Sequence, residues 1–193
     1  MDAHPSFSLS TSRAARLAAG RGHAHADGGY GDRRAACERA AVTLKVGALR
    51  DLGPADLDVA ASVLDPTTLR RVRHVVSENQ RVLDVAHLLR TAGPTSIGQL
   101  LLASHASMRD DFQISTPELD AAVEAAMSAG AIGVRMTGGG FGGSAIALVH
   151  AEDRDAVGES VQAAFRDAGF AEPMVLPVRA TDGASVVREV ATV

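Results

Sequence analysis

The sequence predicts an α+β domain, with helices packed on one face of a small antiparallel sheet. The first part of the chain carries apolar residues at helical spacing and is punctuated by proline and glycine. The later part changes to short apolar runs, separated by a glycine-rich loop and one further helix. Helices followed by a β-loop-β-α-β series are typical of the α+β class.

The helices are predicted from the apolar period and from end signals. Asp65-Pro66 supplies an N-cap and a first-turn proline, and Gly93-Pro94 ends the same helix. Ser115 and Glu118 have the spacing of a capping box at the start of another helix. The predicted helices span residues 32–49, 56–64, 66–90, 96–108, 115–129 and 153–168.

The strands are predicted from short apolar runs, at Ile132–Met136, Ser144–His150, Met174–Val178 and Ser185–Val190. Residues 1–29 are rich in Ser, Arg, Ala, Gly and His and show no sustained period. We therefore predict a poorly ordered N-terminal remnant over 1–29 and one domain over 30–193.

The most informative segment is rich in glycine. Residues 136–143 read Met-Thr-Gly-Gly-Gly-Phe-Gly-Gly, and an apolar run follows at 145–149. Glycine loses more backbone freedom on ordering than any other residue, so this cluster indicates positive φ angles or the close approach of another group. Unshielded N–H groups form anion-binding concavities, which would suit a phosphate or a sugar hydroxyl. A slack or merely tight loop is the alternative that the residues alone leave open.

Two nucleotide motifs are disfavoured at this loop. Gly138, Gly140 and Gly143 satisfy G-x-G-x-x-G, but a strand follows them, whereas the dinucleotide fingerprint opens a helix. A P-loop requires Gly-Lys-Ser/Thr, and Lys45 is the only lysine in the chain.

Six segments together resemble the galactokinases of the GHMP sugar kinase family. They occur in the family's order over about residues 28–186, namely Tyr30–Glu38 (Y-G-D-R-R-A-A-C-E), Arg73–Leu83 (R-H-V-V-S-E-N-Q-R-V-L), Ser104–Phe112 (S-H-A-S-M-R-D-D-F), Ser115–Asp120 (S-T-P-E-L-D), the glycine loop and Asp182–Ala184 (D-G-A). Ser144 stands where the family commonly has cysteine. The resemblance implies a GHMP kinase C-terminal domain over residues 30–193, and an ATP-dependent phosphorylation of galactose at C1.

Three motifs from the first half of such kinases have no match in these residues. They are G-R-x-N-L-I-G-E-H-x-D-Y for the sugar, P-x-G-x-G-L-S-S-S-A for the nucleotide, and M-D-Q for the catalytic aspartate. We therefore interpret the chain as the C-terminal half of a galactokinase that is inactive alone. ATP and Mg²⁺ are cofactors of the intact family, and we expect this chain alone to bind neither. The alternatives are a non-catalytic sugar-binding or regulatory module and a truncated remnant without function.

The resemblance also implies roles for particular residues. It assigns no catalytic residue and no metal ligand to this half. Structural support is expected from His105, Arg73 and Glu78. Substrate binding is expected from Tyr30, Gly138, Gly139, Gly140, Phe141, Gly142 and Gly143.

The residues themselves leave other roles open. Tyr30 could equally pack on the first helix with its hydroxyl in water. Glu78 and Arg81 lie three apart, which favours a surface ion pair on a helix. Asp110-Asp111 could suggest a metal, but their place before a capped helix favours an N-terminal charge role. The His-x-His pair at residues 23–25 has no cysteine or carboxylate cluster nearby, which disfavours a metal site.

Composition excludes several classes of protein. Nineteen basic and 23 acidic residues give a net charge of −4, so no nucleic-acid or membrane partner is expected. A single Cys37 rules out an intrachain disulfide framework and fits a reducing cytosol. We expect a cytoplasmic protein whose partners are galactose and either a separate N-terminal half or a second copy of itself.

Overall fold

The computed structural model describes residues 12–19, 26–178 and 180. At its centre is a four-stranded antiparallel sheet in the order β2-β3-β1-β4. The register places Ala147 of β3 opposite Val134 of β2 on one side and opposite Ala15 of β1 on the other. The strands are β1 (Ser12–Ala19), β2 (Gly133–Thr137), β3 (Gly143–His150) and β4 (Met174–Val178).

Six α-helices and several short turns connect and cover these strands within the described residues. The longest helix, α3, begins at the predicted cap, where Asp65 Oδ1 accepts hydrogen bonds from the N–H groups of Thr67 and Thr68. The helices are α1 (Ala26–Leu44), α2 (Leu57–Val63), α3 (Pro66–Thr91), α4 (Gly98–Ala106), α5 (Pro117–Ser128) and α6 (Arg154–Asp167). The 3₁₀ turns are η1 (Leu49–Asp51), η2 (Pro54–Asp56) and η3 (Pro94–Ile97), and a π-helical turn, η4 (Ser107–Phe112), extends α4.

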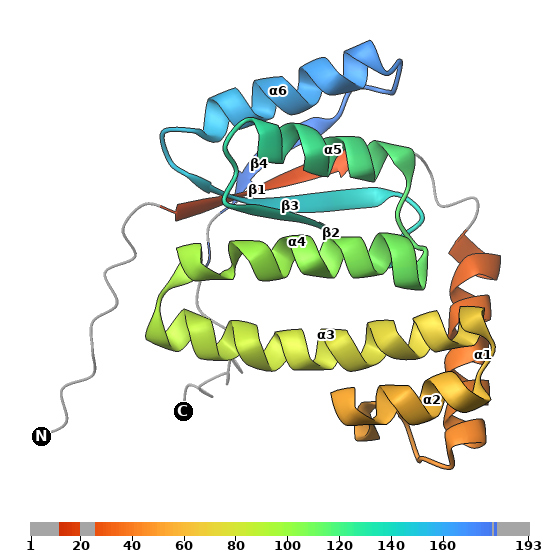
Figure 1. Cartoon of the computed structure of the whole chain (residues 1–193). Coiled ribbons are helices and arrows are strands. Elements are labelled where there is room, and N and C mark those ends of the chain that lie inside the picture. The colour runs from red at the N-terminus through yellow and green to blue at the C-terminus, as the bar shows by residue number, and fades with distance from the viewer. Residues whose placement is uncertain (1–11, 20–25, 179, 181–193) are drawn as a thin grey trace, which may run out of the picture.

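The elements form layers (Figure 1). Helices α5 and α6 cover one face of the sheet, α4 lies on the other face, and α3 runs beyond α4. Helices α1 and α2 pack at one end of α3. The glycine loop connects β2, which ends at Thr137, to β3, which begins at Gly143, and so lies at the end of this hairpin.

The main core lies between the sheet and the pair α5 and α6. Ala145, Ala147 and Val149 alternate along β3 and are fully buried, as expected for one face of a strand. The same buried cluster includes Leu119 of α5 and Phe165 of α6. A second, smaller cluster joins α1, α2 and α3 and contains Ala40, Leu49, Ala60, Val72 and Val76.

The predicted α+β class and antiparallel sheet are confirmed. One detail is corrected, because α4 lies on the face opposite α5 and α6. Two glycines permit this approach. A Cβ on Gly133 would lie 2.5 Å from Gly98 Cα, and a Cβ on Gly98 would overlap the Ile132 carbonyl. The start of α4 thus crosses β2 almost backbone to backbone.

The prediction of a poorly ordered segment over residues 1–29 is wrong for residues 12–19 and 26–29. Residues 12–19 form β1, an inner strand that pairs with both β3 and β4, and residues 26–29 begin α1. The segment Ser-Arg-Ala-Ala-Arg-Leu-Ala-Ala has no β-branched residue, so pairing on two sides overrides a weak local preference. The domain boundary at residue 30 stays a prediction.

Several predicted ends differ from those observed. Helix α1 covers 26–44 instead of 32–49 and stops where Lys45 takes a φ of 56°. The cap of α5 is Thr116 rather than Ser115, since Thr116 Oγ1 accepts from the Leu119 N–H at 3.4 Å. The expected strand Ser185–Val190, the segment Asp182–Ala184 and the histidines at 23–25 lie outside the described residues.

Candidate functional site

The glycine loop has a defined and unusual backbone. Gly138, Gly140, Gly142 and Gly143 have φ values of 96°, 84°, 114° and 102°. Phe141 also has a positive φ, 60°, in the left-handed region that non-glycine residues seldom occupy. The expectation of positive φ angles at this cluster is confirmed, and the merely slack loop is disfavoured.

The loop rests on Ile114, the residue after the turn that follows η4. The Phe141 N–H donates a hydrogen bond of 2.7 Å to the Ile114 carbonyl. At Gly140, a Cβ would lie 2.6 Å from Ile114 Cβ and 2.8 Å from Ile114 O. Glycine is therefore required at 140 by both its φ angle and its packing, whereas a Cβ on Gly139 would meet nothing within 4 Å.

The carbonyls beneath the loop are held by distant arginines. Arg71 donates to Asp111 O and, at 2.7 Å, to Gln113 Oε1. Arg33 of α1 donates through Nε to Phe112 O at 2.6 Å and through Nη2 to Gln113 O at 2.9 Å. With the Phe141 bond, all four carbonyls from 111 to 114 accept a hydrogen bond from a distant segment. Burial lowers the pKa of Arg71, which remains a cation at neutral pH.

The first turn of α1 lies against the loop through Phe141. A Cβ on Gly29 would lie 2.7 Å and 2.9 Å from ring atoms Cε1 and Cε2 of Phe141. The Arg33 guanidinium lies 5.7 Å from the centroid of the same ring, within cation–π range. Tyr30 follows Gly29 and is 61% exposed. The predicted substrate residues therefore come from two elements that meet at Phe141.

His105 links α4 to the strand that leads into the loop. Its Nδ1 accepts from the Met136 N–H at 3.3 Å, and its Nε2 donates to Asp120 Oδ1 at 3.1 Å. These partners assign the neutral form with the proton on Nε2. Burial lowers the pKa of His105, and the attraction of Asp120 offsets this only in part. Asp120 also accepts from Ser115 Oγ at 2.6 Å.

Glu78 ties α3 to α4 through Ser104. Glu78 accepts from Arg81 Nε at 2.5 Å and from Ser104 Oγ at 2.7 Å, and Arg135 lies 3.8 Å away. Burial raises the pKa of Glu78, but the bonds from Ser104 and Arg81 outweigh it and the pKa is lowered overall. The prediction of a solvated surface pair is therefore wrong, since Glu78 and Arg81 are mostly buried between α3 and α4.

Asp111 has a different role from the one predicted. Its carboxylate lies 2.9 Å from Arg73 Nη2, and the adjacent Asp110 pairs with Arg109 at 2.8 Å. Both carboxylates belong to η4 and not to the start of α5. The prediction of an N-terminal charge role for Asp110-Asp111 is corrected accordingly.

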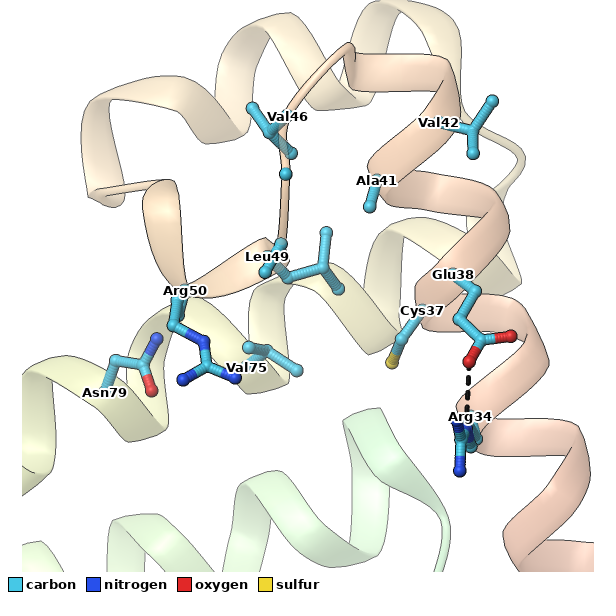
Figure 2. Close-up of a pocket in the computed structure, with 12 residues that line it drawn as sticks. Arg34, Cys37, Glu38, Ala41, Val42, Val46, Leu49, Arg50, Val75 and Asn79 are labelled. Carbon is cyan, nitrogen blue, oxygen red and sulfur yellow. Dashed lines mark hydrogen bonds and ion pairs between the residues drawn. The ribbon is translucent and has the colours of Figure 1, made fainter.

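A separate hollow of about 750 Å³ lies between α1, residues 46–50 and α3 (Figure 2). Cys37, Leu49 and Val75 line it, and an ion pair of 2.8 Å joins Arg34 to Glu38 at its wall. Burial raises the pKa of the Cys37 thiol, which disfavours the reactive thiolate. The lining described here includes neither Tyr30 nor any residue of the glycine loop.

The described residues contain neither a metal-binding cluster nor a membrane-spanning helix. Among residues 12–19, 26–178 and 180, no group of three or more His, Cys, Asp or Glu side chains has the arrangement of a metal site. Within the same residues, no helix combines the length and the apolar character needed to cross a bilayer.

Sequence reasoning did not find Gly29, Arg33, Arg71 or Ile114. Gly29 carried no usable signal, because the predicted helix began only at residue 32 and α1 begins at Ala26. Arg33 could not be separated from Arg34 by sequence, and the contacts that distinguish them are about eighty residues away along the chain.

Known proteins share this architecture and sequence. Residues 85–167 match the family model for the GHMP kinases C terminal. A galactokinase of Streptomyces coelicolor is 52% identical over 164 residues, which are 84% of this chain and 42% of that protein. A galactokinase of Mycobacterium tuberculosis is 49% identical over 166 residues, or 86% of this chain and 46% of that protein.

A solved structure agrees with these relatives. The crystal structure of Lactococcus lactis galactokinase complexed with galactose matches with a TM-score of 0.83 and 29% identity, over 89% of this chain and 46% of that chain. The chain thus spans slightly less than half the length of these relatives. Residues 85–167 therefore match the C-terminal family model of the GHMP kinases, and the chain is similar in sequence and fold to slightly less than half of each of these galactokinases.

Proposed function

We propose that the chain provides the sugar side of an active site that phosphorylates galactose at C1 with ATP. The observation that carries this proposal is the glycine loop, whose backbone is fixed on Ile114 and which meets the Tyr30-bearing turn of α1 at Phe141. Tyr30 and residues 138–143 are the proposed sugar-binding groups. The galactose in the Lactococcus lactis structure supports this choice of sugar.

In the proposed reaction the C1 hydroxyl oxygen attacks the γ-phosphorus of ATP. An oxygen–phosphorus bond forms, the bond to the bridging oxygen of ADP breaks, and the hydroxyl proton passes to a base. Such transfers depend mainly on positioning and charge stabilisation. The glycine loop would contribute unshielded N–H groups beside sugar and phosphate. Tyr30 would contribute a hydroxyl for orientation.

We propose no base, metal ligand or nucleotide loop among the described residues. Mg²⁺ in phosphoryl-transfer sites is usually held by one or two carboxylates together with substrate phosphates, and within the described residues no group of three or more His, Cys, Asp or Glu side chains is arranged to hold a metal. We therefore assign no metal-dependent step to these side chains. The proposed base and nucleotide loop would come from a further segment, such as a separate N-terminal half.

The supporting residues have distinct proposed roles. His105 holds the backbone at Met136, two residues before the loop, while Glu78 joins α3 to α4 through Ser104. Arg73 fixes η4 through Asp111. Each would act through the loop or through η4, without touching the sugar.

The experiment is a chimera in which this chain replaces its matching segment in the Streptomyces coelicolor relative. Galactose-dependent ADP release, measured with a coupled assay, supports the proposal. Glucose in place of galactose is the control for sugar dependence. A chimera that folds and binds galactose but releases no ADP would favour a non-catalytic sugar-binding module.

A further inference from the structure

We infer that Phe141 and Arg33 form a latch that holds the glycine loop against α1. The latch keeps the loop and Tyr30 at a fixed separation, so Arg33 is a positioning residue, and Phe141 adds this role to its proposed sugar contact. This inference rests on the proposed function only for its consequence in catalysis. Its structural part concerns contacts within this chain.

The Phe141 backbone is in an unfavourable conformation that needs support. A φ of 60° is uncommon for a bulky residue, and such angles persist where the surroundings fix them. One support is the 2.7 Å hydrogen bond from its N–H to Ile114 O. The ring supplies the other, because it packs on the bare backbone of Gly29.

Arg33 closes the latch through its guanidinium. Its Nε and Nη2 are held by Phe112 O and Gln113 O, which immediately precede the carbonyl that anchors Phe141. These two bonds limit the rotation of the guanidinium, which lies 5.7 Å from the Phe141 ring centroid. One side chain on α1 therefore fixes both the ring and the segment on which the loop rests.

Tyr30 lies between the two α1 residues that contact Phe141. Gly29 precedes it and Arg33 follows it within one turn of the helix. A loop that lifts from Ile114 must also withdraw the ring from Gly29 and Arg33. Loop and tyrosine are therefore expected to move together and to present one preformed sugar surface.

Neighbouring residues provide matched controls. Gly29 and Gly31 both lie inside α1, but a Cβ on Gly31 would meet nothing within 4 Å. Both alanine substitutions gain a similar helix propensity. The two variants therefore differ in the displacement of the Phe141 ring, which only Gly29→Ala should cause. Arg33→Lys loses a two-pronged donor, whereas Arg34→Lys alters an exposed pair with Glu38.

The test is hydrogen exchange of the Phe141 amide in the full chain, followed by NMR without sugar. Gly29→Ala and Arg33→Lys should each exchange roughly tenfold faster than wild type, the scale of one lost ring contact. Gly31→Ala and Arg34→Lys should match wild type. Thermal unfolding identifies any variant that fails to fold. If both Gly29→Ala and Arg33→Lys are folded and exchange at the wild-type rate, the latch is overturned.

A double variant tests the contact itself. In the Phe141→Leu background the aromatic ring is absent, so adding Gly29→Ala should change exchange less than it does in wild type. Equal effects in both backgrounds would contradict a contact between Gly29 and the ring.

The chimera described above tests the consequence for catalysis. Gly29→Ala should raise the KM for galactose and lower kcat about tenfold, leaving the KM for ATP unchanged. A chimera without activity would count against the proposed function and leave the exchange result standing. Normal kinetics in Gly29→Ala together with fast exchange would show that the latch does not position the sugar site.

Discussion

Alanine substitutions along the glycine loop should destabilise the chain in an order set by φ and by space. Gly139→Ala meets neither a positive φ nor a close atom, so it should change the free energy of unfolding by less than about 1 kcal/mol. Gly138→Ala has open space but a φ of 96°, which should cost roughly 1–2 kcal/mol. Gly140→Ala adds overlap with Ile114 to a φ of 84°, for roughly 2–5 kcal/mol in total.

Urea unfolding followed by circular dichroism measures this series. The midpoint should fall in the order Gly139→Ala, Gly138→Ala, Gly140→Ala, with an unchanged dependence on denaturant. The upper value for Gly140 assumes that the loop stays on Ile114. A loop that lifts would limit the cost and expose the Phe141 amide to exchange. If Gly140→Ala is no more destabilising than Gly138→Ala, and the amide stays protected, the proposed packing on Ile114 is refuted.

Three further predictions concern activity, pH and assembly. The purified chain with galactose and ATP should release no ADP above background, and a rate comparable to an intact kinase that a glycine-loop substitution abolishes would contradict this. Burial lowers the pKa of His74 and His105 below 6.5, so the unfolded chain binds more protons and stability should fall as pH drops below that value. His105→Gln should weaken this pH dependence of the thermal midpoint, and a profile identical to that of wild type would exclude His105 as a cause. Exposed apolar side chains at Val82 and Leu83 lead us to expect self-association or binding of a separate half, and light scattering that finds a stable monomer at all concentrations would oppose it.

Sequence reasoning predicted the elements whose signals are local. Asp65 and Pro66 marked the start of α3, and Met174–Val178 was predicted with the observed bounds. The glycine cluster correctly indicated positive φ angles, because glycine is the residue that adopts them without steric cost. The order of the motifs indicated a resemblance to the galactokinases, and the sequence relatives and the solved structure agree with it.

The missed features depend on distant partners. β1 is a strand only because β3 and β4 lie on both sides of it, and its alanines and arginines carry no strand signal. The π-helical turn η4 has no sequence mark that separates it from a continued α4. Arg33 and Arg71 resemble surface arginines until the fold brings them to the carbonyls of 111–113.

We propose that the glycine loop lies on the sugar side of the phosphoryl-transfer site. The most direct measurement compares steady-state kinetics of the Streptomyces coelicolor chimera with and without Gly140→Val. We expect a large fall in kcat with little change in the KM for ATP, because a Cβ at 140 displaces the loop from Ile114. Equal turnover, or a defect confined to the KM for ATP, would contradict the claim and leave the loop with a structural role alone.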